Sequence, residues 1–440
     1  MKINFATAIL FIPILILTIA CGKKSIFGET VITRWKDGKT GAVSLTFDDG
    51  SINQFRVAVP VLDSLGMPGT FFIITGEIPG SRYSPRFIGR PMDKIISETA
   101  VTPTDSGNLF ERASVVAYAP YKGLREYFTR AGEFYESGKV KEACQVLDQA
   151  FARVRNHSLK PIRATQPDTT QSLTWNRVRH MAAHGHEFAS HTVTHPYLCI
   201  LDEANIQYEL EKSKEEIDEQ LGPRFTFSAE CPYGIEDSRV MEFAYKTYPA
   251  LRNRMPEPFL AELDRSSHLD PGAQHKEYVQ WQRGALTATP MNLMNSWIDT
   301  CTSKDNIWLV LVFHGVEGIG WEPLKREVLV SYFSYLHSRE NKLWVATFGD
   351  VSRYMRERMA SGVITKKGKD RLEIRVTNPL GKDYDIPLTL KTYVAESRVA
   401  FNVRQGIHTI NFHEGTDDKG SYIIYSINPN GEAVHLTASE

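Results

Sequence analysis

Apolar and amphipathic segments alternate along the chain up to residue 358. Residues 43–47 and 69–74 are short, apolar and β-branched, which predicts two buried strands, and residues 57–65 between them predict a helix. Residues 175–183 and 202–221 predict two further helices, the second one amphipathic. Residues 225–229 predict the next strand, and residues 352–359 predict the last helix of this part of the chain. This repetition of strand and helix predicts a parallel α/β fold, in the form of an irregular (β/α) barrel.

The pattern changes after the charged residues 366–369. Polar and apolar residues then alternate with a period of two between turn residues. That pattern predicts a small β-sandwich-like domain over residues 366–440. A unit of this size is near the lower limit for an independent core, so we expect it to pack on the barrel.

Two motifs carry metal chemistry. Residues 46–50 (TFDDG) lie at the end of the first predicted strand, and residues 191–195 (HTVTH) follow a short predicted strand at 188–190. Each motif alone is also typical of an ordinary turn or of surface histidines. Together, however, two imidazoles and a carboxylate form a common ligand set for a catalytic divalent metal. Both motifs end parallel strands, and these strand ends meet at one edge of the sheet.

A third candidate is His314, which ends the most apolar strand of the barrel, residues 307–313. Its unperturbed pKa lies near neutrality, which suits a general acid. The other interpretation is a histidine that only caps a strand end.

With these motifs the chain resembles the polysaccharide deacetylase family, also known as the NodB-homology group or carbohydrate esterase family 4. Residues 46–50 and 191–195 match its first two motifs, while residues 231–234 (CPYG) and 311–315 (LVFHG) resemble parts of its third and fifth. The resemblance covers roughly residues 30–358. It implies a distorted (β/α) barrel with about seven strands.

The resemblance also implies roles for residues. Asp48 would be the general base, His314 the general acid, and the backbone N–H of Tyr233 would stabilise the oxyanion. A divalent metal, usually zinc, would be bound by three residues: Asp49, His191 and His195. The implied reaction is hydrolysis of acetyl groups on a poly- or oligosaccharide, above all N-acetyl groups of an N-acetylhexosamine glycan, which makes the chain a linear-amide hydrolase. An O-acetyl esterase and a catalytically silent glycan-binding lipoprotein stay open as alternatives.

Two departures from the family pattern affect the surroundings of Asp48. Glu230 stands where the family's third motif often has an arginine that orients the base. Arg283 is a candidate substitute from another strand. The fourth motif has no clean copy, and Trp297 lies in a segment that reads as a helix, where a packing role is expected.

Between the first two motifs lies a long interruption, which we assign to a helical insertion over residues 80–170. It contains two predicted helices, at 121–137 and 139–154. Its aromatic residues at helical spacing favour core packing over sugar binding.

The N-terminus predicts export. Residues 1–20 have the pattern of a signal peptide, and a small residue before Cys21 suggests cleavage and lipid attachment at that cysteine. We therefore expect a bacterial cell-envelope protein with a membrane anchor. The 51 basic and 52 acidic residues give no basic excess, which argues against nucleic-acid binding. Cys199 and Cys231 are candidates for a disulfide or for free buried thiols.

Overall fold

The computed structural model describes residues 26–162, 172–235, 237–252, 254–255, 257–395 and 400–439. The predicted signal peptide and Cys21 lie outside these residues. Within the described part of the chain, no helix combines the length and the apolar character needed to cross a membrane.

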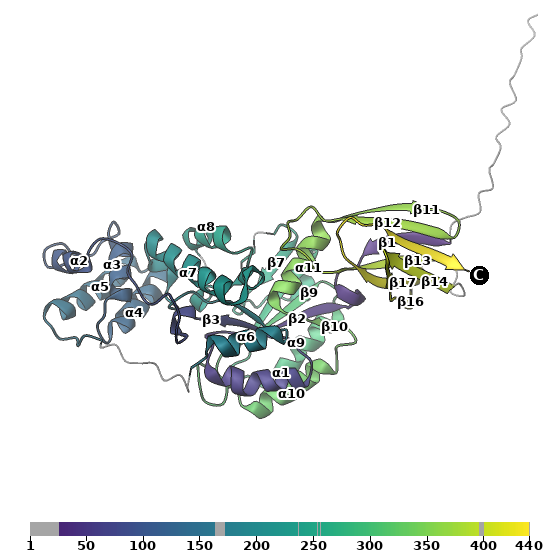
Figure 1. The fold of residues 1–440 in the computed structure, drawn as a ribbon. Coiled ribbons are helices and arrows are strands. Elements are labelled where there is room, and N and C mark those ends of the chain that lie inside the picture. Colours follow the sequence, from purple (N-terminus) through teal and green to yellow (C-terminus); the bar gives the residue numbers. More distant parts are fainter. Residues whose placement is uncertain are drawn as a thin grey trace, which may run out of the picture.

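The centre of the molecule is a nine-stranded parallel sheet (Figure 1). In the described part of the chain its two end strands, β6 and β7, do not pair with each other, so the barrel is open between them. Eight strands follow the order β6-β5-β4-β3-β2-β9-β8-β7, and β10 pairs with β2. The strands are β2 (Gly41–Phe47), β3 (Thr70–Ile73), β4 (Glu187–Ser190), β5 (Ser228–Ala229), β6 (Ala250–Leu251), β7 (Leu260–Leu263), β8 (Tyr278–Gly284), β9 (Ile307–Phe313) and β10 (Leu343–Val345). The structure therefore confirms the predicted α/β barrel class.

The central strands β2 and β9 are buried along their whole length, as expected for a parallel sheet covered on both faces. Six register pairs join them, from Ala42 opposite Trp308 to Phe47 opposite Phe313. Because the strands are parallel and in register, the residues after Phe47 and Phe313 leave the sheet side by side. The following helices cover the barrel: α1 (Val59–Ser64), α6 (Trp175–Ala183), α7 (Glu203–Leu221), α8 (Ser238–Thr247), α9 (Met291–Ser303), α10 (Arg326–His337) and α11 (Phe348–Ala360).

Two local predictions need correction. Residues 225–229 were expected to form a strand, but Pro223–Thr226 form a 3-10 turn and only Ser228–Ala229 pair in β5. Pro223 starts this turn, and the Thr226 hydroxyl donates to Asp218 at 2.6 Å. The last helix begins at Phe348 instead of residue 352, because Thr347 caps it by accepting from the Asp350 N–H.

The insertion lies at one end of the barrel (Figure 1) and contains four helices: α2 (Met92–Glu98), α3 (Leu109–Tyr118), α4 (Leu124–Glu136) and α5 (Val140–Arg155). The last two correspond to the predicted helix pair. Their apolar faces share a core with residues of α7, α8 and the loop after His195. Tyr118 and Phe128 are buried in this core, so packing accounts for most of their surface.

At the opposite end lie two antiparallel sheets packed face to face (Figure 1). One sheet has the order β1-β13-β17-β16 and the other β11-β12-β18-β14-β15. The strands are β1 (Phe27–Ile32), β11 (Gly362–Lys367), β12 (Arg371–Thr377), β13 (Leu388–Val394), β14 (Ala400–Gln405), β15 (His408–Ile410), β16 (His413–Asp417), β17 (Gly420–Ile427) and β18 (Val434–Ser439). The N-terminal strand β1 thus belongs to the sandwich, where it pairs with β13.

The sandwich packs directly on α11 of the barrel. Tyr354 is fully buried in the sandwich core, and its hydroxyl donates to the Thr33 carbonyl at 3.1 Å. The buried Glu357 side chain accepts a hydrogen bond from the Ile386 N–H at 2.8 Å. These buried contacts hold the two units together, as expected from the small size of the C-terminal unit.

Candidate metal centre and active site

Six polar side chains lie at the mouth of the barrel, each directly after a parallel strand or one residue later. Asp48 and Asp49 follow β2, and His314 follows β9. The other three follow neighbouring strands on the β4 side: His191 after β4, Glu230 after β5 and Arg252 after β6. The carboxyl edge of the sheet therefore brings together residues that are up to 266 positions apart in the sequence.

Asp49, His191 and His195 form a compact group of ligands. One donor atom from each lies within 4.8 Å of the other two. Asp49 Oδ1 is 3.7 Å from His191 Nε2 and 3.4 Å from His195 Nε2. His191 Nδ1–H donates to the Glu230 carbonyl at 2.9 Å, which leaves Nε2 as the acceptor that faces Asp49. The three predicted metal residues therefore converge on one point.

The electrostatics of this group fit a divalent cation. Burial lowers the pKa of His191 to about 4 and that of His195 to about 3, so both rings are neutral at pH 7, as ligands must be. Burial and the neighbouring charges of Asp48 and Glu77 raise the pKa of Asp49 to about 7. A bound cation would supply the positive charge that Asp49 needs in order to ionise there.

Asp48 is held by a buried arginine. Arg252 Nη1 donates to Asp48 Oδ1 at 2.8 Å, and Nη2 donates to Oδ2 at 2.6 Å. Nη2 also lies 2.8 Å from Glu230 Oε1. Burial by itself raises the pKa of Asp48, but the Arg252 guanidinium and His314 hold it well below its usual range. Asp48 is therefore ionised and fixed in orientation.

Arg252 fills the place of the arginine that the third motif lacks. The predicted substitute was wrong, because Arg283 donates instead to the carbonyls of Arg265 and Ser267. Glu230 adds negative charge near Asp48, and its Oε1 pairs with the same Arg252 Nη2 that binds Asp48 Oδ2. In this chain the guanidinium comes from the end of β6 and a carboxylate from the end of β5.

His314 faces Asp48 from β9, with its Nε2 3.4 Å from Asp48 Oδ2. Burial lowers the pKa of His314 to about 4, although Asp48 opposes this shift. The ring is therefore neutral at pH 7. Gln54 ties the two strand ends together, because its amide donates to the backbone carbonyls of Asp48 and His314 at 2.5 and 2.7 Å.

Tyr233 lies beside the ligand group and has a left-handed backbone, with φ of 65°. Its ring stacks on Tyr197 with centroids 3.9 Å apart and contacts the edge of His195 at 4.7 Å. Asp49, Thr192 and His195 also have positive φ values. A non-glycine residue in this region costs on the order of 1–3 kcal/mol, so the surrounding structure must hold these residues in place.

A buried glutamate, not predicted from the sequence, holds the loop between the two histidines. Glu209 on α7 accepts from the N–H groups of Val193 and Thr194 at 2.9 and 2.8 Å, and from the Thr194 hydroxyl at 2.6 Å. A fourth donor is the Tyr118 hydroxyl of α3, at 2.7 Å. Glu209 therefore connects the metal loop to the insertion.

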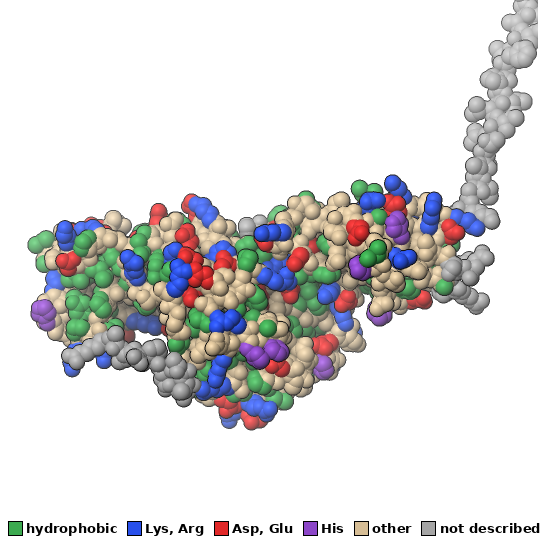
Figure 2. All heavy atoms as spheres, in the orientation of Figure 1, with side chains coloured by type: hydrophobic (Ala, Val, Ile, Leu, Met, Phe, Trp, Pro, Cys, Tyr) green, Lys and Arg blue, Asp and Glu red, His purple; other side chains and the backbone are tan. Residues whose placement is uncertain are grey.

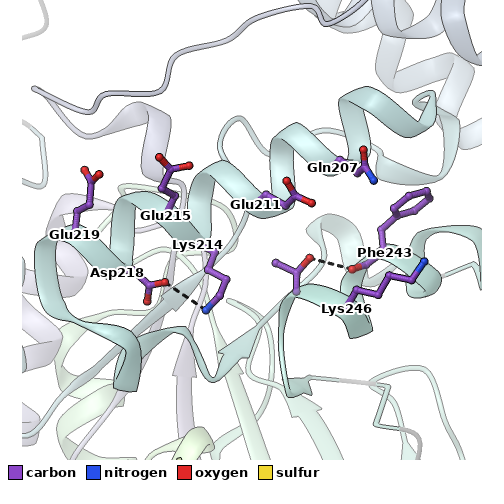
Figure 3. Close-up of a pocket in the computed structure, with 9 residues that line it drawn as sticks. Gln207, Glu211, Lys214, Glu215, Asp218, Glu219, Phe243 and Lys246 are labelled. Atoms are coloured by element: carbon purple, nitrogen blue, oxygen red, sulfur yellow. Dashed lines mark hydrogen bonds and ion pairs between the residues drawn. The ribbon is translucent and has the colours of Figure 1, made fainter.

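A groove between α7 and α8 differs from the candidate metal centre in the residues that line it. It measures about 510 Å³ and is lined by charged residues of both helices (Figure 3). Lys214 already pairs with Asp218 across one turn of α7, at 3.5 Å. None of the predicted site residues lines this groove. On the face of the molecule drawn in Figure 2, acidic and basic side chains are interspersed, in keeping with the net charge of −1.

The remaining predicted residues have structural roles. Trp297 packs in the barrel core from α9, as expected. Four buried cysteines among the described residues take part in no disulfide: Cys144, Cys199, Cys231 and Cys301. The disulfide considered between Cys199 and Cys231 is therefore not formed.

Comparison with known proteins identifies the barrel. A family model described as polysaccharide deacetylase matches residues 36–98 and 118–248, and its gap falls inside the insertion. A gellan lyase from Bacillus sp. is 25% identical over 279 residues, which are 59% of this chain and 11% of that protein. The chain thus spans about a tenth of the length of that curated relative.

Several solved structures are similar to this chain at low identity. A putative polysaccharide deacetylase from Mycobacterium smegmatis is 15% identical, with 75% of this chain and 94% of that chain covered and a TM-score of 0.36. The chitin deacetylase of Colletotrichum lindemuthianum is 15% identical, with 71% and 88% covered and a TM-score of 0.33. A family 4 carbohydrate esterase from Streptomyces lividans in complex with acetate is 12% identical, with 70% and 92% covered and a TM-score of 0.33.

The Glu209 network predicts weaker metal binding in Glu209→Gln. A carboxylate accepts all four hydrogen bonds, whereas the amide group of glutamine turns a second donor toward two of them. We expect the dissociation constant for zinc, measured by chelator competition, to rise about 10- to 100-fold, as for other groups that orient ligands.

Tyr118→Phe is the matched control, because it removes one donor and leaves the loop N–H bonds intact. Its dissociation constant should change much less. A Glu209→Gln protein with a native circular dichroism spectrum and wild-type zinc affinity would show that the loop does not depend on this carboxylate.

Proposed function

We propose that this protein hydrolyses acetyl groups of a carbohydrate, because the chain belongs to the polysaccharide deacetylase family. We further propose N-acetyl groups of an N-acetylhexosamine glycan as the substrate and zinc as the metal. One observation carries this proposal: two groups of residues lie together at the carboxyl edge of the sheet. The first group is the candidate ligands Asp49, His191 and His195, and the second is the pair Asp48 and His314.

The metal would be held by Asp49, His191 and His195, and when bound it would act as a Lewis acid and lower the pKa of water. Asp48, ionised and oriented by Arg252, accepts the proton of the attacking water. The backbone N–H of Tyr233 donates to the oxyanion that develops on the acetyl carbonyl.

The second proton transfer involves His314. Its ring is neutral before the reaction, so it must first receive a proton before it can donate one. Asp48 Oδ2 lies 3.4 Å from His314 Nε2 and is placed to pass that proton on. His314 then protonates the leaving amine, and the products are acetate and the free amino sugar.

Two alternatives use the same site. An O-acetyl esterase needs the same residues and differs only in the leaving alcohol. A silent glycan-binding protein needs no working acid–base pair, whereas this chain keeps Asp48 and His314 together with all three ligands, which favours an enzyme.

The function test is acetate release from N-acetylglucosamine oligomers, peptidoglycan and acetylated xylan by the zinc-loaded protein. Asp48→Asn should retain zinc and lose turnover, because a base is removed and no ligand. His314→Ala should lower kcat by about 10²–10⁴-fold. Wild-type rates in either variant would refute the assigned roles, and a zinc-loaded wild type without acetate release would favour the silent protein.

Arg252 should act as a positioning residue for Asp48. Arg252→Lys keeps the positive charge between Asp48 and Glu230 but cannot form the two-point bond. We expect kcat to fall about 10²-fold with little change in KM or zinc content, because small misplacements of catalytic groups have effects of that size.

Arg283→Lys is the control for that measurement, because Arg283 binds two backbone carbonyls and packs over the Trp281 ring, and it does not contact Asp48. An equal decrease of kcat in Arg252→Lys and Arg283→Lys would argue against a specific role for Arg252.

We also propose export and lipid attachment at Cys21, supported by the signal-peptide pattern of residues 1–20. In a bacterial host, Cys21→Ser should abolish incorporation of labelled palmitate and move the protein out of the membrane fraction. Unchanged membrane retention would indicate another anchor.

A further inference from the structure

A cavity of about 630 Å³ lies between the insertion and the candidate metal centre. One side is formed by the metal loop, including His195, and by Tyr233. The other side is formed by the end of α3 and the start of α4, including Arg125 and Thr129. Because His195 lines the cavity, a sugar bound there would be a neighbour of the sugar at the metal centre.

Tyr233 gives the cavity a rigid aromatic wall. Its side chain keeps 39% of its surface exposed, one of the few large apolar side chains of the barrel mouth to do so. The ring is fixed by Tyr197 behind it and by His195 at its edge. An exposed ring held in this way offers a flat surface for the apolar face of a sugar.

Arg125 brings positive charge into the same cavity. It is the second residue of α4, it is exposed, and its guanidinium lies close to the Tyr233 side chain. Arg125 interacts electrostatically with Asp49 and Glu77. Among the described residues, however, no carboxylate oxygen lies within 4.0 Å of its guanidinium nitrogens. Arg90, by contrast, pairs with Glu98 and Glu111 elsewhere in the insertion.

We propose that this cavity is a subsite for a sugar residue that carries a carboxylate, and that Arg125 binds this carboxylate. The proposal rests on the proposed deacetylase function and adds a substrate class to it: an acetylated glycan with an acidic sugar next to the acetylated one. A guanidinium matches a carboxylate at two points, and such bonds are stronger than those to neutral hydroxyls. The ring of the same sugar packs against Tyr233.

The experiment compares two forms of one acetylated oligosaccharide, one with a uronic acid beside the acetylated sugar and one with that carboxyl group reduced to an alcohol. The wild type should deacetylate the acidic form with a kcat/KM at least about tenfold higher, as expected for a charged hydrogen bond. Arg125→Gln should remove this preference by raising KM for the acidic form alone, and Arg125→Lys should keep part of it.

Arg130→Gln is the matched control, because Arg130 is exposed on the same helix and does not line the cavity. It should behave as the wild type. The subsite proposal would be refuted if the wild type showed no preference for the acidic form. It would also be refuted if Arg125→Gln lowered kcat/KM equally for both forms.

Calorimetric binding of the deacetylated acidic product separates this proposal from the proposed function. If the wild type releases no acetate from either form, the deacetylase proposal fails, yet tighter binding of the acidic product than of its reduced form, lost in Arg125→Gln, would still support the subsite. Equal binding of both forms would refute it.

Discussion

The mouth of the barrel depends on one buried cation. Arg252 is completely buried and lies between two buried carboxylates, Asp48 and Glu230. Charges buried in this way are tolerated only when they are paired and hydrogen-bonded, and removal of one partner typically costs about 3–5 kcal/mol. Without Arg252, two carboxylates would face each other at the strand ends. The ion pair therefore fixes both the orientation of Asp48 and the charge balance of the site.

The rest of the site is held in an unfavourable backbone conformation by its surroundings. Asp49, Thr192, His195 and Tyr233 have left-handed backbones, although none is a glycine. The hydrogen bonds that oppose this strain come from behind the site: Glu209 binds the loop, and Thr192 accepts from the His195 N–H at 3.0 Å. The hydrogen bonds of the fold thus hold the candidate metal ligands in these positions, which would reduce the reorganisation that metal binding requires.

Much of this arrangement could be predicted from the sequence, because several candidate residues directly follow apolar segments that predict strands. Asp48, Asp49, His191 and His314 all follow recognisable strands. Arg252 could not be found in this way, since β6 has only two residues and no apolar run marks it. Glu209 was missed because its helix is rich in exposed acidic residues, and only tertiary packing shows that this one is buried. The sequence did not show that β1 belongs to the sandwich, because β1 pairs with β13, which lies more than 350 residues later in the chain.

That pairing has a mechanical consequence for a chain anchored at Cys21. Only five residues separate Cys21 from Phe27, the first residue of β1, so an extended tether would reach roughly 20 Å. The sandwich would be held close to the lipid surface, while the barrel mouth and the insertion lie toward the other end of the molecule (Figure 1). The sandwich would then act as a rigid stalk. The distance between the membrane and the glycan that reaches the site would be set by the length of the folded protein and not by a flexible linker.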